Sequence, residues 1–177
     1  TISRRQRQMC IRDRRITAWV KEKLAAIRAS DSPWSEFAFT VHGTMADPRW
    51  LDPSIEPSDR KPGGCYLGDP KIVNDGPVGL ARFCTLRSWL SQWSYDDARC
   101  DAIASGGRIS VPVLVVGNSA DDACTPSHTQ RLYDAVTHER KHLHVVKGAT
   151  HYYTGAQGAE HMAEACGVIE NFLTRQW

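Results

Sequence analysis

The residue types that can carry acid–base chemistry gather between positions 121 and 151. Asp121 and Asp122 follow a mostly β-branched run at 111–116, and His151 follows a second apolar run at 143–146. A histidine can take up and return a proton near neutral pH, and a carboxylate beside its ring determines which ring nitrogen carries the proton. The pattern therefore predicts that His151 works as a base with Asp121 or Asp122 as its carboxylate partner.

A strand, a helix and a second strand would position these side chains. The run at 111–116 is short and unbroken, which favours a strand that is buried on both faces and ends at Gly117. Thr125 and Pro126 predict the start of a helix, with the threonine hydroxyl as its cap. A second strand at 143–146 then completes a parallel pair with a crossover helix. Ligand-handling residues of open parallel sheets lie beyond the carboxyl ends of the strands, where all three side chains fall.

The order of these features resembles the C-terminal half of the α/β-hydrolase fold. The matching residues are Gly117-Asn118-Ser119-Ala120-Asp121-Asp122 with Pro126 downstream, then Lys147-Gly148-Ala149-Thr150-His151-Tyr152. The resemblance implies an α/β fold class, with parallel strands and flanking helices, and a triad in the order nucleophile, acid, histidine. It also implies a carboxylic-ester substrate, whose hydrolysis His151 would assist by moving a proton. The Ala-Asp step after the strand favours Asp121 as the acid, and counting back from Pro126 favours Asp122; we expect Asp121.

The nucleophile that this resemblance implies is missing from the sequence. The family carries it on a Gly-x-Ser-x-Gly elbow, and the sequence contains no such motif. The nearest segment, 117–121, lacks the closing glycine and lies on the acid's own strand. Either the chain is the C-terminal portion of a larger serine hydrolase, or it is a complete protein that has kept the fold without the chemistry. We expect the first, because the chain enters directly at lid-type sequence.

Residues 1–14 are expected to form a basic arm without apolar periodicity. Residues 1–15 contain six arginines and one aspartate, a charge of +5, so the net charge of +2 leaves −3 for the remainder. Aromatic residues do not alternate with these arginines, so a nucleic-acid partner is not expected. Residues 9–14 resemble a translated sequencing-adapter remnant. On that resemblance the arm would not belong to the native protein, and the native sequence would begin near Arg15.

Residues 15–107 are expected to form the lid or insertion region of the hydrolase. Helical spacing predicts a helix over 16–29, and alternation predicts a strand over 37–41, followed by a turn at 42–44. The long segment 43–75 holds five prolines and is either an ordered lid or substrate wall, or an irregular stretch packed on the body. The insertion region is thus mainly helical and irregular.

A helix over 77–93 is apolar around most of its circumference, which predicts that it is buried or faces a partner. A weaker helix is expected over 96–105. The resemblance implies that residues 108–177 are the C-terminal α/β-hydrolase segment. One apolar face of its last helix is expected to pack against the sheet, and its members are Met162, Ala165, Cys166, Ile169, Phe172 and Leu173. The non-enzymatic alternative is a binding or scaffold module that uses the tryptophan-rich helix as its contact surface. In that case His151 would turn away from both aspartates.

Composition and the remaining motifs restrict other functions. The chain has 177 residues, 41% hydrophobic and 24% charged, which suits one globular domain. It contains neither an apolar run of membrane-spanning length nor a secretory core, so a cytoplasmic location and no membrane partner are expected. The six cysteines include no Cys-x-x-Cys pair, which favours reduced thiols.

No cofactor or metal is expected. A nicotinamide cofactor would require a Gly-x-Gly-x-x-Gly motif after a strand, and the sequence has none. His138, His142 and His144 are close in sequence, but a turn and a strand separate their directions. The sequence contains no signal for the oligomeric state.

Overall fold

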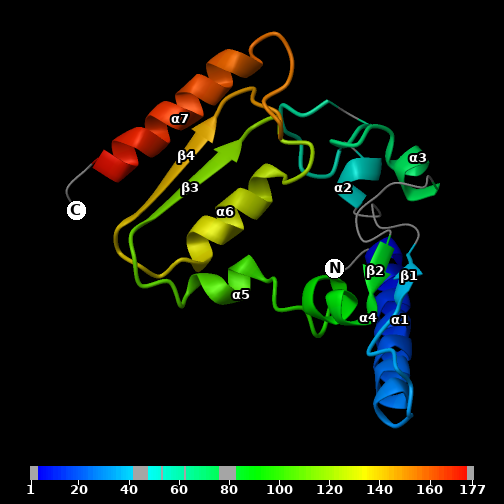
Figure 1. Cartoon of the computed structure of the whole chain (residues 1–177). Coiled ribbons are helices and arrows are strands. Elements are labelled where there is room, and N and C mark those ends of the chain that lie inside the picture. Colours follow the sequence, from blue (N-terminus) through cyan, green and yellow to red (C-terminus); the bar gives the residue numbers. More distant parts are fainter. Residues whose placement is uncertain (1–3, 42–47, 53, 62, 76–82, 175–177) are drawn as a thin grey trace. The chain divides into compact units, whose positions relative to one another are not determined.

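The predicted parallel pair is present in the computed structural model, which describes residues 4–41, 48–52, 54–61, 63–75 and 83–174. Strand β3 (Val113–Asn118) pairs in parallel with β4 (Lys141–Val146), and helix α6 (Pro126–Ala135) connects them (Figure 1). The register places Val113 opposite Lys141 and Asn118 opposite Val146. This is a mixed α/β arrangement, and its two strands end at the same edge.

The chain divides into two compact units. Unit 1 comprises residues 1–51 and 67–100, and unit 2 comprises residues 52–66 and 101–177. Unit 2 therefore contains the parallel pair together with a short stretch, 52–66, from the proline-rich segment that we expected to form a lid or a packed irregular stretch.

Helices cover both faces of the parallel pair in unit 2. Leu143 and Val145 line a cavity with residues of α6, whereas His144 contacts Glu164 of helix α7 (Gly158–Thr174). Because successive side chains of a strand point to opposite faces, α6 and α7 lie on opposite sides of the pair.

Gly117 does not end β3 as expected, because the strand continues through Asn118. The glycine instead permits close packing of the helix: a Cβ atom at position 117 would lie 2.5 Å from Cγ2 of Thr129 in α6. The strand is also less buried than expected, since Val113 and Leu114 keep intermediate exposure while Val115 is buried.

We expect Gly117→Ala to lower the free energy of unfolding of unit 2 by about 1–3 kcal/mol, because the methyl group would force β3 and α6 apart. The matched control is Gly167→Ala in α7, where nothing lies within 4 Å of the added atom. That change should stabilise unit 2 by about 0.5–1 kcal/mol, because alanine loses less backbone entropy in a helix. Native-state hydrogen exchange of the β3 amides measures both. Equal effects of the two substitutions would contradict this account of Gly117.

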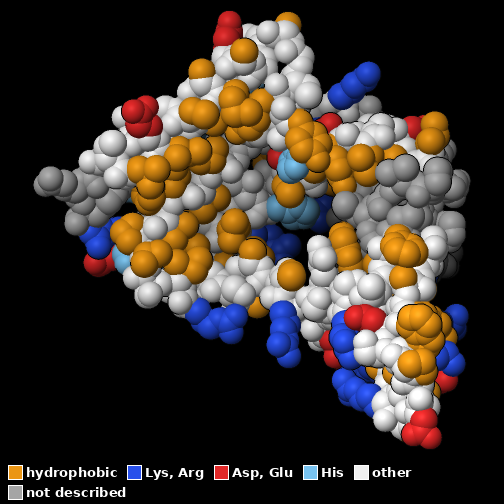
Figure 2. All heavy atoms as spheres, in the orientation of Figure 1, with side chains coloured by type: hydrophobic (Ala, Val, Ile, Leu, Met, Phe, Trp, Pro, Cys, Tyr) orange, Lys and Arg blue, Asp and Glu red, His pale blue; other side chains and the backbone are white. Residues whose placement is uncertain are grey.

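Only part of the apolar surface of α7 packs on the sheet. Ala165 is buried against Val146 and Ala149. Phe172, another member of the expected face, contacts the ring of His142 in β4. The rest of that face is open, since the exposed fractions of Met162, Ile169 and Leu173 are 45%, 43% and 74%. Hydrophobic side chains accordingly gather on the surface over α7 (Figure 2). The expected packing is therefore observed for Ala165 and Phe172 and not for Met162, Ile169 and Leu173.

Unit 1 is built around helix α1 (Arg4–Arg28) and a two-stranded antiparallel sheet of β1 (Ala38–Thr40) and β2 (Phe83–Thr85). The helix begins at Arg4 rather than near residue 16, so the described part of the expected arm is helical. Two short helices, α2 (Pro48–Leu51) and α3 (Pro70–Asp75), interrupt the proline-rich segment. The turn expected at 42–44 lies outside the described residues.

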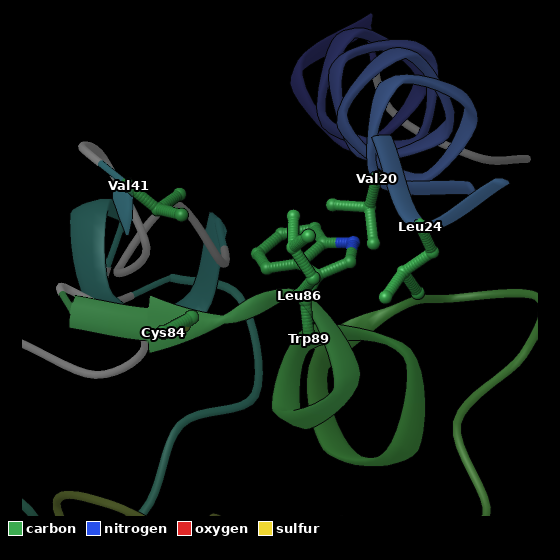
Figure 3. Close-up of a cluster of buried hydrophobic side chains, with 6 residues drawn as sticks. All are labelled: Val20, Leu24, Val41, Cys84, Leu86 and Trp89. Atoms are coloured by element: carbon green, nitrogen blue, oxygen red, sulfur yellow. The ribbon is translucent and has the colours of Figure 1, made fainter. Parts of the chain in front are cut away.

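The core of unit 1 is a cluster of buried side chains from α1, the sheet and the helical turns that follow it (Figure 3). These turns are α4 (Leu86–Ser88) and the π-helix η1 (Trp89–Trp93). The buried members are Val20, Leu24, Val41, Cys84, Leu86 and Trp89. Trp89 therefore belongs to the core.

The single helix expected over 77–93 is wrong for residues 83–85, which form β2 and expose 76% of Phe83. A capping box explains the break: the Thr85 hydroxyl accepts from the Ser88 amide at 3.2 Å, and the Ser88 hydroxyl accepts from the Thr85 amide at 2.9 Å. Helical structure therefore starts only after Thr85. The first part of the expected helix, residues 77–82, lies outside the described part of the chain.

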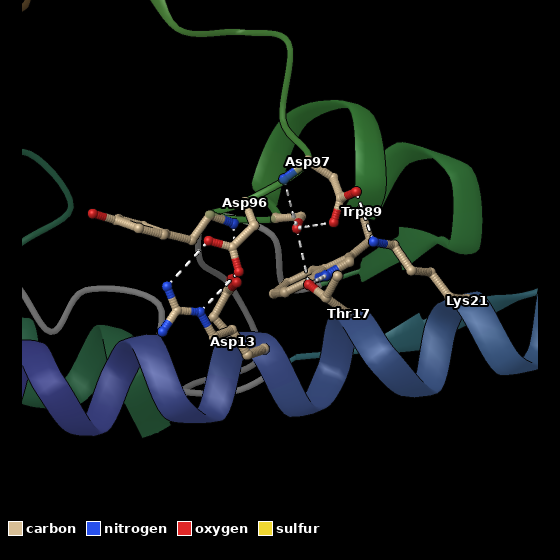
Figure 4. A network of polar contacts seen from close by, with 9 residues as sticks. Asp13, Thr17, Lys21, Trp89, Asp96 and Asp97 are labelled. Carbon is tan, nitrogen blue, oxygen red and sulfur yellow. Dashed lines mark hydrogen bonds and ion pairs between the residues drawn. The ribbon is translucent and has the colours of Figure 1, made fainter.

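The helix expected over 96–105 is reduced to α5 (Ala102–Gly106), because residues 94–97 form a turn that bonds to α1 (Figure 4). Arg14 pairs with Asp96 at 2.8 Å and Lys21 with Asp97 at 2.7 Å. Thr17 accepts a hydrogen bond from the Trp89 indole at 3.0 Å. Within the described residues, no helix is long and apolar enough to cross a membrane.

Leu86→Ala should lower the free energy of unfolding of unit 1 by about 2–5 kcal/mol, because Leu86 is fully buried and its loss leaves a cavity. Leu67→Ala is the matched control in the same unit: this side chain is 41% exposed, and its truncation should cost no more than about 0.5 kcal/mol. Urea titration followed by tryptophan fluorescence measures both values. A small effect at Leu86 would contradict the assignment of this core.

Candidate active site

The site is built where β3 and β4 end. Residues 119–125, the acid loop, follow β3, and residues 147–151, the histidine loop, follow β4. The structure brings Asp121 and His151 together: Nδ1 of the imidazole lies 3.1 Å from each oxygen of the carboxylate. Asp121 is buried and the His151 side chain is partly exposed, so solvent reaches the imidazole more readily than the carboxylate.

The Asp121 carboxylate is oriented by its own loop. One oxygen accepts hydrogen bonds from the backbone amides of Ala123 at 2.7 Å and Cys124 at 2.6 Å. Such an aspartate turn fixes the carboxylate relative to the main chain. The acid therefore reaches the histidine ring in a defined orientation.

Hydrogen bonds also tie the two loops to each other. The Ala120 amide donates to the Ala149 carbonyl at 3.0 Å, and the Asn118 side-chain amide donates to the Thr150 carbonyl at 3.0 Å. The second bond is next to His151 in the chain. These hydrogen bonds fix the position of the histidine loop relative to the acid loop.

Asp122, the other predicted acid, is not the partner of His151. Its backbone carbonyl accepts a hydrogen bond from the Tyr66 amide at 3.1 Å, which fixes the middle of the acid loop. Of the two predicted residues, Asp121 is the one whose carboxylate contacts the His151 ring.

Two tyrosine rings surround His151. The centroid of its ring lies 5.7 Å from that of Tyr66 and 4.8 Å from that of Tyr152. Burial raises the pKa of the Tyr66 hydroxyl, and the nearby Tyr152 raises it further. The position of Tyr66 beside His151 could not be predicted from the sequence, because the two residues are far apart along the chain and only the tertiary structure brings their rings together.

A cavity of about 480 Å³ is lined by both Asp121 and His151. Its walls include Val115 and Val116 from β3 and Leu132 from α6. This volume lies within the range of small-molecule sites, which are mostly apolar with a few polar groups. The arrangement can hold an apolar group beside an acid–base pair.

Ser119, Cys124 and Ser127 are the nearest candidates for a nucleophile, and none of them contacts the His151 ring. Ser119 donates to Asp59 at 2.5 Å, and Ser127 donates to Glu56 at 2.7 Å. Partial burial raises the pKa of the Cys124 thiol, and the charge of Asp121 raises it further, which disfavours the reactive thiolate. Among the described residues, the hydrogen bonds of the His151 ring go to Asp121 alone.

The three histidines considered as metal ligands go to separate partners. Nδ1 of His138 accepts from the Arg140 amide, the His142 ring contacts Phe172, and His144 pairs with Glu164 at 2.7 Å. No group of three potential ligand residues that could hold a metal ion occurs in the part of the chain that the structure describes.

The fold and the site define a mixed α/β unit with an aspartate–histidine pair at the carboxyl edge of two parallel strands. No protein-family model and no curated protein matches the chain. Among solved structures, the crystal structure of a monoacylglycerol lipase from Paleococcus ferrophilus is similar at 18% identity with a TM-score of 0.40. The match covers 84% of this chain and 51% of the lipase, so the chain spans about half of that protein's length. A likeness of this size does not assign a family.

We expect Asp121→Asn to change the protonation pattern of the His151 ring and Asp122→Asn to leave it unchanged. In the unsubstituted chain the proton of the neutral ring should lie on Nδ1 and be donated to Asp121. Loss of a hydrogen bond to a charged group should reduce the ratio of Nδ1–H to Nε2–H forms roughly tenfold or more. Nitrogen-15 NMR of the imidazole measures this ratio. An equal effect of Asp122→Asn on this ratio would contradict the assignment of Asp121 as the carboxylate partner of His151.

Proposed function

We propose that Asp121 and His151 are the acid and base of a serine-type α/β hydrolase that acts on carboxylic esters. We further propose that this sequence is the C-terminal part of that enzyme and binds a small-molecule ester. The contact between the Asp121 carboxylate and Nδ1 of His151, at 3.1 Å, carries the proposal. It leaves the other ring nitrogen available, and both residues line an apolar cavity.

In the proposed reaction, His151 takes the proton of a serine hydroxyl as the serine oxygen attacks the ester carbonyl carbon. The imidazolium then gives this proton to the departing alkoxide, so that the alcohol leaves and an acyl-enzyme remains. Water repeats the sequence: His151 accepts its proton, and the acyl group leaves as the carboxylic acid when the proton returns to the serine oxygen. Asp121 holds the imidazole in the tautomer that can accept a proton and stabilises the imidazolium.

The nucleophile is proposed to belong to a segment outside this sequence. Two observations support this placement: the sequence lacks a Gly-x-Ser-x-Gly elbow, and the hydroxyls of Ser119 and Ser127 already donate to carboxylates. The scaffold alternative is less well supported, because it requires a histidine that turns away from both aspartates. The observed contact with Asp121 has the opposite geometry.

Hydrolysis of p-nitrophenyl acetate tests where the nucleophile lies. We expect the purified chain to hydrolyse this ester no faster than its His151→Ala variant, because the base has no nucleophile to activate. The matched control is His144→Ala, which removes a histidine that pairs with Glu164 on the α7 side of the sheet. Circular dichroism checks that all three proteins fold.

Turnover that is lost in His151→Ala and kept in His144→Ala would place the nucleophile inside this sequence and contradict its proposed origin. The acid–base pair itself is tested separately by the imidazole tautomer. A ring that carries its proton on Nε2 in the unsubstituted chain would contradict the hydrolase proposal.

A further inference from the structure

Residues 54–61 form a tight turn in unit 2, here called the strap, which a buried arginine organises. The Arg60 guanidinium donates to the carbonyls of Glu56 at 2.6 Å and Ile55 at 3.0 Å, and to the Ser58 hydroxyl at 3.0 Å. Arg60 is only 7% exposed. The turn places Glu56 in the left-handed backbone region at φ +57°, which non-glycine residues rarely adopt.

The Glu56 carboxylate holds the end of the acid loop. One oxygen accepts the Ser127 backbone amide at 2.7 Å, and the other accepts the hydroxyls of Ser127 at 2.7 Å and Thr125 at 3.0 Å. The expectation that the Thr125 hydroxyl caps α6 is therefore wrong. The Glu56 carboxylate caps the first turn of α6 instead, and the hydroxyl of Thr125, which is fully buried, donates to Glu56.

Asp59 of the strap holds the start of the same loop and links it to the histidine loop. Its carboxylate accepts the Ser119 hydroxyl at 2.5 Å, and its amide donates to the Ser119 carbonyl at 3.1 Å. The hydroxyl oxygen of Ser119 in turn accepts a hydrogen bond from the Gly148 amide at 2.7 Å. Lys147 contacts Asp59 at 2.6 Å. This exposed ion pair alone contributes little, but the hydrogen bonds join the strap to both loops.

We propose that Glu56 and Asp59 are positioning residues, through which the strap holds both ends of the acid loop and keeps Asp121 in contact with His151. This inference rests on the proposed function of that pair. The strap is more than a helix cap, because Thr125 could cap α6 by itself without a glutamate in an unfavourable backbone conformation. One turn of chain instead contacts the loop at Ser119 and at Thr125, on either side of the acid.

The test is the His151 tautomer in variants of Glu56, measured by nitrogen-15 NMR. Glu56→Ala removes the contact with the acid loop and should reduce the ratio of Nδ1–H to Nε2–H forms roughly tenfold, as expected for loss of the bond to Asp121. Glu56→Asp keeps the charge but shortens the reach, and should reduce the ratio likewise. Glu56→Gln keeps the reach and should retain most of the ratio. Asp59→Asn, which weakens the Ser119 contact, should lower it less than Glu56→Ala.

Glu164→Ala is the matched control, because it removes a glutamate that contacts a different histidine, His144. It should leave the His151 tautomer unchanged. Protection of the β3 and β4 amides from exchange verifies folding in each variant. If Glu56→Ala does not fold, Glu56→Asp and Glu56→Gln, which keep a polar group at this site, supply the same comparison.

A tautomer ratio that stays unchanged in folded Glu56→Ala, or that is equal in Glu56→Asp and Glu56→Gln, would overturn the positioning role. Asp121→Asn separates this outcome from failure of the proposed function. If Asp121→Asn changes the ratio and the strap variants do not, only the positioning role fails. If Asp121→Asn has no effect, the acid–base pair itself fails.

Discussion

The site depends on the parallel register of β3 and β4. Because Asn118 lies opposite Val146, both strands end at one edge, and the loops that follow them begin side by side. If one strand shifted by one residue against the other, its side chains that face α6 would turn to α7, and those that face α7 would turn to α6. The close approach of α6 at Gly117 restricts such a shift, since β3 offers no other residue without a side chain. The acid–base geometry is thus a consequence of strand pairing and helix packing.

Strand pairing alone does not orient a carboxylate in a loop. The polar groups of the acid loop have three sets of hydrogen-bond partners. Backbone amides of the loop itself donate to the Asp121 carboxylate, and the histidine loop and the strap supply the other partners. Buried polar groups that lack partners are costly, so each of these bonds also restricts the conformations that the loop can adopt. The same hydrogen bonds therefore stabilise unit 2 and set the direction of the acid.

The sequence predicted those parts of the molecule that local patterns determine. The strand–helix–strand order and the Pro126 helix start follow from features within a few residues. The contact of an aspartate with His151 follows once the two strands are paired in parallel, because both loops then begin at one edge. The errors arose where distant residues intervene. Glu56 takes the capping role expected of Thr125 from 69 positions away, and Thr129 determines why position 117 is glycine. Phe83 joins a sheet because β1 supplies a partner strand. Such long-range partners leave no periodic signal in a single sequence.

Exposure decides which polar contacts matter most. The side chains of Arg14 and Asp96 are 58% and 47% exposed, so their ion pair in unit 1 is solvated and contributes little beside the buried cluster around Leu86. The Asp121 side chain, by contrast, is 9% exposed, so its carboxylate is less screened by water and salt than the surface pair. A charge held in that environment can polarise the imidazole ring effectively. Unit 1 is thus stabilised chiefly by apolar packing, whereas unit 2 uses its buried polar groups to orient the histidine.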